Sequence, residues 1–364
     1  MSLERNSGRP PTLGEAWRAG ADRLGQAGVE EANADAELLL LYALGIGKAE
    51  LLRDLRDPFP EEKNKIWLEL LERRAAGVPV QYAVGEQYFY GRAFEVSSAV
   101  LIPRPETELL AEAVLKAGDL IWPESGAGAG SAANGQAAAF GREGEAAGLG
   151  REGEATGLGS AKVAGPRRAK VEEVSAEEGR TGRREAFLSA PVVLDVGTGS
   201  GALAVTLAAE RPGWRVTASD LSEEALQVAR GNARKHGADG RISFVQGDLL
   251  QPFLTSAAGG GLAVDILVSN PPYIPSSDIP GLQREVRDHE PRLALDGGED
   301  GLNPYRTMAG QLKELPMLPR IVAWEVGAGQ ARDVAELLRA AADWAEIRIV
   351  VDYAGIERHV VAVR

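Results

Sequence analysis

The first quarter of the chain repeats apolar residues at helical spacing. Thr12 can cap a segment over residues 13–24, and ANADAELLLLYALG (32–45) ends at a glycine, which is the usual residue after a helix. Residues 48–55 and 60–76 continue the same periodicity, with a proline near the start of the second segment. The pattern predicts a small bundle of helices.

Residues 86–104, EQYFYGRAFEVSSAVLIPR, change to an alternating pattern rich in Tyr, Phe and Val. Alternation over such a stretch is typical of strands, and we expect a β-hairpin that links two domains. Pro105 then begins a further helix, PETELLAEAVLKAG.

From residue 192 onward, short apolar strands alternate with helices. The expected strands are 192–197, 214–220, 242–248, 264–270, 321–327, 346–353 and 358–364, and the expected helices are 202–210, 222–236 and 330–341. This alternation predicts a mostly parallel, doubly wound sheet, and the last two strands, joined by a short turn containing Gly355, form an antiparallel pair. In such sheets a ligand binds beyond the carboxyl ends of the strands, where the strand order reverses.

Residues 124–186 differ from the rest in composition. They hold 14 of the 44 glycines, and GREGEAAGL (141–149) is followed at once by the near copy GREGEATGL (150–158). So few large apolar side chains cannot offset the cost of ordering, about 1–2 kcal/mol per residue. We expect a disordered low-complexity insert.

Composition removes several classes of site. The chain has no cysteine, which excludes disulfides, thiolate nucleophiles and cysteine-ligated metals, and its three histidines are scattered, so no metal site is expected and none of them is given a catalytic role. No apolar run approaches the length of a membrane span, and we expect a cytoplasmic protein. The formal net charge of −13 opposes broad binding to nucleic acid, for which a basic face is expected.

A glycine-rich loop joins the first strand after the insert to its helix. It reads Asp195-Val-Gly197-Thr-Gly199-Ser-Gly201, and Asp220 ends the next strand, where a carboxylate can accept hydrogen bonds from both ribose hydroxyls. The loop also satisfies the dinucleotide pattern, so NAD is a competing ligand, and a glycine turn without any ligand is a further alternative. A carboxylate ahead of the loop favours S-adenosylmethionine, because it attracts a cationic group and repels a pyrophosphate.

The tetrapeptide Asn270-Pro271-Pro272-Tyr273 follows the fourth strand of the same region. Two prolines stiffen the backbone and leave its carbonyl groups free to accept hydrogen bonds, while Asn270 adds an acceptor and Tyr273 an aromatic face. These features suit a planar group that carries an NH₂. The alternative is a simple turn opened by Asn-Pro.

Taken together, these segments resemble the release-factor glutamine methyltransferases (the PrmC/HemK family). The matching segments are EANADAELLLLYALG (31–45), LIPRPETELL (101–110), VLDVGTGSGALAVTLA (193–208), VSNPPYIP (268–275), EPRLALDGGEDGLNPYR (290–306), WEVGAGQ (324–330) and DYAGIERHVVAVR (352–364). Other amino-methyltransferases share the Asn-Pro-Pro-Tyr motif, but its combination with the 101–110 and 290–306 segments is highly specific. Residues 124–186 have no counterpart in the family pattern.

The resemblance implies an α/β fold of the class I methyltransferase type, with a Rossmann-like, mostly parallel sheet of seven strands, an antiparallel C-terminal hairpin and a small N-terminal helical bundle. It implies a helical substrate-binding domain over 1–85, a β-hairpin linker over 86–104 and a methyltransferase domain over 105–364, interrupted by the insert. The implied reaction moves a methyl group from S-adenosyl-L-methionine to the side-chain amide nitrogen (N5) of the glutamine in the Gly-Gly-Gln motif of class 1 peptide-chain release factors.

The resemblance also implies the site residues. Catalysis and substrate binding fall to Asn270, Pro271, Pro272 and Tyr273, and cofactor binding to Gly197, Thr198, Gly199, Ser200, Gly201, Asp220, Asp248, Leu249 and Asn270. Glu106 either closes over the cofactor or is simply a favourable charge in the first turn of its helix.

Two other functions compete with this one. An adenine-N6 methyltransferase would accept the same planar NH₂, but it needs a basic groove, which the net charge opposes. A non-catalytic S-adenosylmethionine-binding module would predict a damaged Asn-Pro-Pro-Tyr motif, and here the motif is intact. We expect a monomer that acts on a protein substrate, without direct contact to nucleic acid or membrane.

Overall fold

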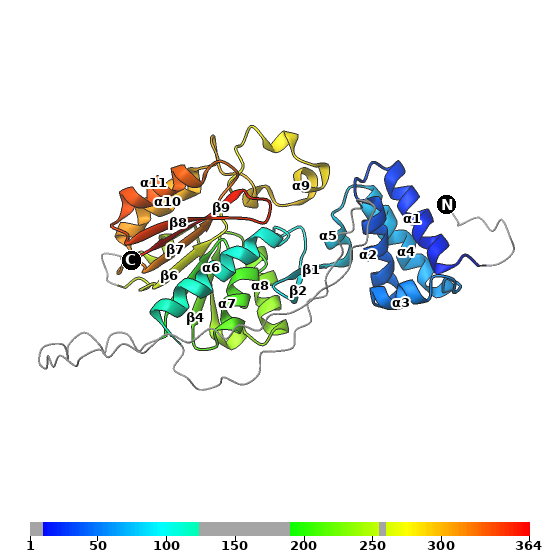
Figure 1. The fold of residues 1–364 in the computed structure, drawn as a ribbon, viewed down its shortest axis with the longest axis horizontal. Coiled ribbons are helices and arrows are strands. Elements are labelled where there is room, and N and C mark those ends of the chain that lie inside the picture. Colours follow the sequence, from blue (N-terminus) through cyan, green and yellow to red (C-terminus); the bar gives the residue numbers. More distant parts are fainter. Residues whose placement is uncertain (1–9, 124–189, 255–259) are drawn as a thin grey trace, which may run out of the picture. The chain divides into compact units, whose positions relative to one another are not determined.

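The structure is a computed structural model that describes residues 10–123, 190–254 and 260–364 (Figure 1). Its N-terminal part is the predicted helical bundle. The helices are α1 (Leu13–Gln26), α2 (Ala32–Leu44), α3 (Lys48–Arg53), α4 (Asn64–Ala75) and α5 (Val80–Val84). The predicted cap of α1 is confirmed, since Thr12 and Glu15 form a reciprocal capping box. Gly45 ends α2 in the left-handed conformation, also as expected.

The predicted hairpin is shorter than its sequence pattern. It consists of β1 (Glu86–Phe89) and β2 (Arg92–Glu95), paired antiparallel. Phe89 and Phe94 are buried in the same core as the large sheet, so the hairpin is packed into the domain that follows it. After Glu95 the chain leaves the strand.

The large sheet has the predicted seven strands, in the order β5-β4-β3-β6-β7-β9-β8. Their bounds are β3 (Val192–Val196), β4 (Arg215–Asp220), β5 (Ile242–Gln246), β6 (Ile266–Ser269), β7 (Ile321–Glu325), β8 (Glu346–Val351) and β9 (Glu357–Val363). The first five are parallel, and β9 pairs antiparallel with both β7 and β8. The strand order reverses between β3 and β6, which places a ligand crevice at their carboxyl ends.

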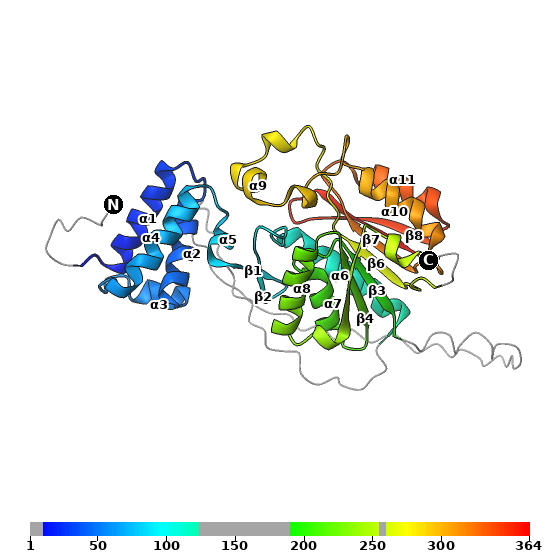
Figure 2. The same cartoon turned by 180° about the vertical axis from the view of Figure 1, so that it is seen from behind.

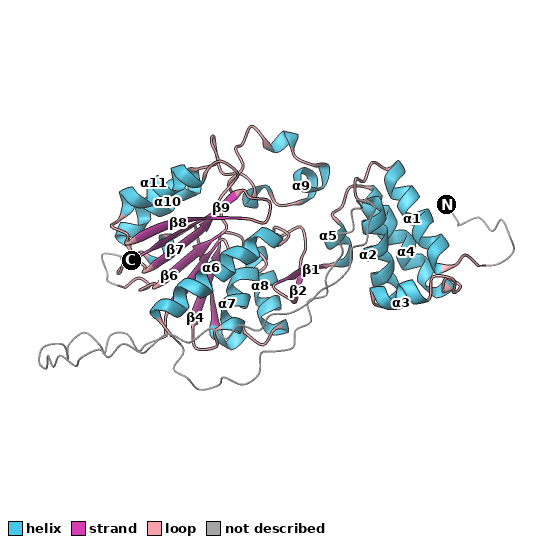
Figure 3. Ribbon diagram, viewed as in Figure 1, coloured by secondary structure: helices cyan, strands magenta, loops and turns pink. Residues whose placement is uncertain are grey.

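Helices cover both faces of this sheet (Figures 2 and 3). They are α6 (Pro105–Ile121), α7 (Ala202–Glu210), α8 (Glu223–Lys235), α10 (Asn303–Gln311) and α11 (Ala331–Ala341). Alternate strand residues enter two separate cores: Val193 lies in the core with α6 and α7, and Leu194 in the core with α10 and α11. The near-continuous apolar strands of the sequence follow from this burial on both faces.

The hydrophobic pattern did not predict the helices between β6 and β7. This stretch contains α9 (Arg284–His289) and α10, whose residues are largely polar. The proposed insert 124–186 lies outside the described residues. Among the residues that are described, no helix has the length and apolar character needed to cross a bilayer.

Candidate functional site

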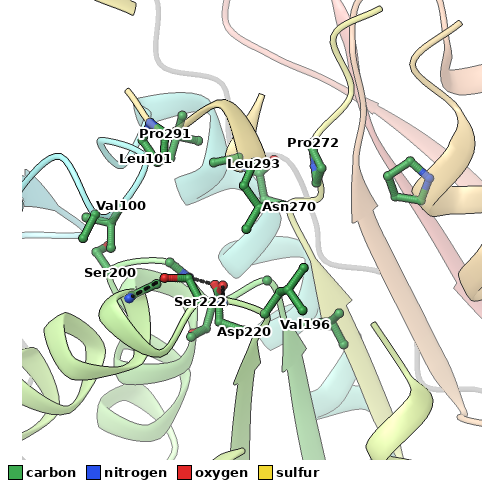
Figure 4. Close-up of a pocket in the computed structure, with 18 of the residues that line it drawn as sticks. Val100, Leu101, Val196, Ser200, Asp220, Ser222, Asn270, Pro272, Pro291 and Leu293 are labelled. Atoms are coloured by element: carbon green, nitrogen blue, oxygen red, sulfur yellow. Dashed lines mark hydrogen bonds between the residues drawn. The ribbon is translucent and has the colours of Figure 1, made fainter. Parts of the chain in front are cut away.

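A cavity of about 710 Å³ opens at the carboxyl ends of β3, β4 and β6 (Figure 4). This is the position at which the strand order reverses. Most of the predicted cofactor residues line it, together with Pro272 from the Asn-Pro-Pro-Tyr motif: Gly197, Thr198, Gly199, Ser200, Asp220, Asp248, Leu249 and Asn270. Gly201, Pro271, Tyr273 and Glu106 are not part of its lining.

The glycine-rich loop owes its shape to backbone angles that favour glycine. Gly197 and Gly201 have φ of 71° and 80°, in the left-handed region. At Gly201, a Cβ atom would lie 3.1 Å from the Cβ of Ala229, so this glycine also lets α7 approach α8 closely. Gly201 therefore shapes the loop from behind the cavity.

Asp195 supports the same loop from inside the protein. It is fully buried, and its Oδ2 accepts hydrogen bonds from the Thr198 hydroxyl at 2.6 Å and the Ala204 amide at 3.2 Å. Burial raises the pKa of Asp195 to about 7. Its side chain does not line the cavity, so Asp195 shapes the cavity through the loop that it supports.

Asp220 ties two loops together at the end of β4. Its Oδ2 accepts from the Gly199 amide and its Oδ1 from the Ser222 amide, both at 2.9 Å. Burial raises the pKa of Asp220, and these two hydrogen bonds oppose the rise. The carboxylate lies at the cavity wall with oxygen lone pairs left to accept further donors.

The turn after β5 forms another part of the wall. Leu249 has φ of 46°, which for a residue other than glycine costs about 1–2 kcal/mol. Leu249 and Asp248 both line the cavity. Strained backbone of this kind is found where the surrounding structure fixes a ligand-facing loop.

The Asn-Pro-Pro-Tyr motif divides between the cavity and the core. Asn270 faces the cavity, and its Nδ2 donates a hydrogen bond to Thr107 Oγ1 at 3.2 Å. Tyr273 packs against the core on the α10–α11 face, and its carbonyl accepts a hydrogen bond from Gln330 at 3.0 Å. Burial raises the pKa of Tyr273 to about 12.

Several cavity residues were missed by sequence reasoning. They come from the segment before α6, from its first turn, from the loop around residues 291–294 and from the start of α10, namely Ser98, Ala99, Val100, Leu101, Pro103, Arg104, Thr107, Pro291, Leu293, Ala294, Asn303, Pro304 and Thr307. Most lie in or beside the segments 101–110 and 290–306, so the family resemblance was a signal that these stretches belong to the site. Arg104 and Glu290 join the two segments by an ion pair at the cavity edge.

The described part of the chain holds no cluster of three or more side chains suited to a metal ion. The polar groups at the cavity instead include the carboxylates of Asp220 and Asp248, the amide of Asn270 and loop backbone. This set suits a ligand with hydroxyl groups on one side and a planar amide on the other.

Comparisons with known proteins agree on one family. Residues 15–85 match the family described as PrmC N-terminal domain, and residues 188–291 match the one described as methyltransferase domain. Similar proteins named release factor glutamine methyltransferase include one from Bacillus subtilis, 36% identical over 96% of this chain and 97% of its own length. Others come from Moorella thermoacetica, 35% identical over 97% of both chains, and Bacillus cereus, 34% identical over 90% of both.

Proposed function

The chain belongs to the release factor glutamine methyltransferases, and on this premise we propose that S-adenosylmethionine binds in the 710 Å³ cavity and that Asn270 holds the glutamine amide there. The chain methylates a glutamine of release factors. We assign that glutamine to the Gly-Gly-Gln motif of class 1 release factors, modified at its amide nitrogen in the cytoplasm. One observation carries the proposal: Asn270 and the glycine-rich loop face a single cavity.

The cavity fits this cofactor in size and in chemistry. Its volume lies within the range of about 300–1,000 Å³ that is usual for small-molecule sites. The glycine-rich loop would lie against the methionine and ribose parts, Asp220 would accept the ribose hydroxyls, and Asp248 with Leu249 would flank the adenine. When bound, the cofactor supplies a methyl group on a positively charged sulfur.

Asn270 has the task of orienting a weak nucleophile. An amide nitrogen is weak because its lone pair is delocalised into the carbonyl group. We propose that Asn270 Oδ1 accepts one N–H group of the glutamine amide and that the carbonyl of Pro271, which adjoins the cavity residues Asn270 and Pro272, accepts the other. The two hydrogen bonds would aim the amide nitrogen. Such positioning can lower a barrier by about 7–11 kcal/mol at best. No strong general base is needed, because a methylated, cationic amide loses its proton readily to water.

Mass spectrometry of a release factor after incubation with the enzyme and isotope-labelled S-adenosylmethionine tests the function. We expect one labelled methyl group on the glutamine of the Gly-Gly-Gln motif, and none when that glutamine is replaced by alanine. Label in adenine-containing oligonucleotides, with none in the release factor, would instead support an adenine methyltransferase.

Asp220→Ala tests the cofactor site. We expect calorimetry to show weaker S-adenosylmethionine binding, because each lost bond to a charged group is worth about 1.5–3 kcal/mol, or roughly ten- to 150-fold in affinity. Asp239→Ala is the control, since Asp239 is an exposed carboxylate of the same domain outside the cavity. Equal affinities for the two variants would refute the ribose assignment.

A further inference from the structure

Asn270 stands at one end of a series of hydrogen-bonded polar groups, the Asn270–Thr107–Glu325 series, whose other members are buried. Asn270 Nδ2 donates to Thr107 Oγ1 at 3.2 Å, and Thr107 Oγ1 donates to Glu325 Oε2 at 2.7 Å. Thr107 and Glu325 are 5% and 2% exposed. Thr107 stands in the first turn of α6, whereas Asn270 follows β6 and Glu325 ends β7, the neighbouring strand.

Two buried side chains flank Glu325. His359 on β9 is the cross-strand partner of Glu325, and its Nε2 lies 3.6 Å from Glu325 Oε2. Neither ring nitrogen of this fully buried histidine makes a hydrogen bond within the described part of the chain, so the carboxylate is the ionisable group that it faces. The Tyr305 hydroxyl donates to the backbone carbonyl of Glu325 at 2.6 Å.

The carboxylate of Glu325 fixes which group donates and which accepts in each hydrogen bond of this series. A carboxylate can only accept hydrogen bonds, and a hydroxyl has one proton. The proton of Thr107 is therefore engaged by Glu325, and Thr107 turns only lone pairs toward Asn270. Two facing acceptors would repel each other, so Asn270 must turn its NH₂ to Thr107, which leaves Oδ1 free for the cavity.

We propose that Thr107 and Glu325 are positioning residues that select the orientation of the Asn270 side-chain amide. Without them the amide could rotate by half a turn and present its own NH₂ to an incoming NH₂ group, and two such groups cannot form a hydrogen bond. The proposal rests on the proposed function of Asn270 as the acceptor for the glutamine amide. It extends the site to two residues that act on the glutamine amide through Asn270.

The decisive experiment exchanges donors and acceptors along the Asn270–Thr107–Glu325 series. In Asn270→Asp the new carboxylate faces the lone pairs of Thr107, and we expect single-turnover methylation of a release factor to slow by at least about tenfold. When Glu325→Gln is added, the introduced glutamine amide donates to Thr107, whose proton then turns to the introduced aspartate. We expect the double variant to recover at least about fivefold over Asn270→Asp. If Thr107 and Glu325 do not set the orientation of the side chain at position 270, the second substitution will be harmful or neutral.

Substitutions of Thr107 supply a matched control. Thr107→Val should slow the reaction at least about tenfold, and Thr107→Ser, which restores the hydroxyl, should stay within about threefold of the unmodified chain. Thr206→Val is the control, because Thr206 is also buried and its hydroxyl has no hydrogen-bond partner among the described residues. S-adenosylmethionine affinity should fall far less than the rate in these variants.

Thermal unfolding of the same variants separates this proposal from the proposed function. Asn270→Asp should lower the melting temperature, and adding Glu325→Gln should raise it again, whether or not a release factor is methylated. If the release factor is not methylated but the melting temperature recovers in this way, the proposed function is refuted. The orientation of the Asn270 amide by Thr107 and Glu325 is then still supported. A double variant that recovers neither rate nor melting temperature, or a Thr107→Val variant that behaves as Thr206→Val, would overturn the positioning role.

Discussion

Asn270→Ala is expected to slow methyl transfer by about 10²–10³-fold, the loss that follows removal of one oriented polar group from an active site. The substitution removes the Oδ1 acceptor at the cavity and the hydrogen bond to Thr107. It leaves the glycine-rich loop and Asp220 unchanged, because these are held by Asp195 and by backbone amides rather than by Asn270.

The measurement is a single-turnover assay with a release-factor substrate, paired with calorimetry of S-adenosylmethionine. We expect the rate to fall while the cofactor affinity stays within about threefold. The loss of an interaction that is made only with the reacting group lowers the rate and leaves cofactor binding unchanged. Turnover close to that of the unmodified chain would make the Asn-Pro-Pro-Tyr segment a structural turn. A parallel loss of cofactor affinity would place Asn270 in the cofactor site instead.

The parts of the fold that the sequence predicted are those with strong periodicity. The strands β3, β4, β6 and β7 are largely buried on both faces, so their apolar runs are unmistakable, and Gly45 and Thr12 mark helix ends by their local chemistry. By contrast α9 has no buried residue, and hydrophobic periodicity cannot detect a helix whose side chains face outward.

The candidate site likewise has one part that the sequence predicted and one part that only the structure shows. Gly199 and Asn270 follow strands and Asp220 ends one, so the rule for doubly wound sheets brings them together from sequence alone. Thr107 precedes Asn270 by 163 positions, and only the folded chain shows that a helix start reaches the end of β6. The hydrogen bond between them therefore has no signature in residue spacing.

The bundle α1–α4 supplies none of the cavity lining, whose first residue is Ser98. We propose that it binds the release factor, because a protein substrate needs roughly 800 Å² of contact per partner and the cavity admits only one side chain and a cofactor. It has its own apolar core, which includes Leu39 and Trp67. Its loss should therefore affect the protein substrate far more than the cofactor.

Removing residues 1–77 is expected to lower kcat/KM for a release factor at least about 100-fold, or close to 3 kcal/mol, with S-adenosylmethionine affinity retained. A cut before Val78 is preferable to one after residue 85, because it keeps Tyr82, whose hydroxyl donates to the carbonyl of the cavity residue Val100 at 2.5 Å. Equal turnover with and without the bundle would contradict its role in substrate binding.

The complete chain allows a milder form of this test. Arg74 in α4 forms ion pairs with Asp35 in α2 and with Glu285 in α9, so it joins the bundle to the segment between β6 and β7. Glu285→Gln weakens only the second pair and leaves Arg74 paired with Asp35. If the bundle guides the release factor to Asn270, this variant should raise KM for the release factor severalfold while kcat and cofactor affinity stay unchanged. A fall in kcat at constant KM would mean that the contact shapes the cavity and not the docking of the protein substrate.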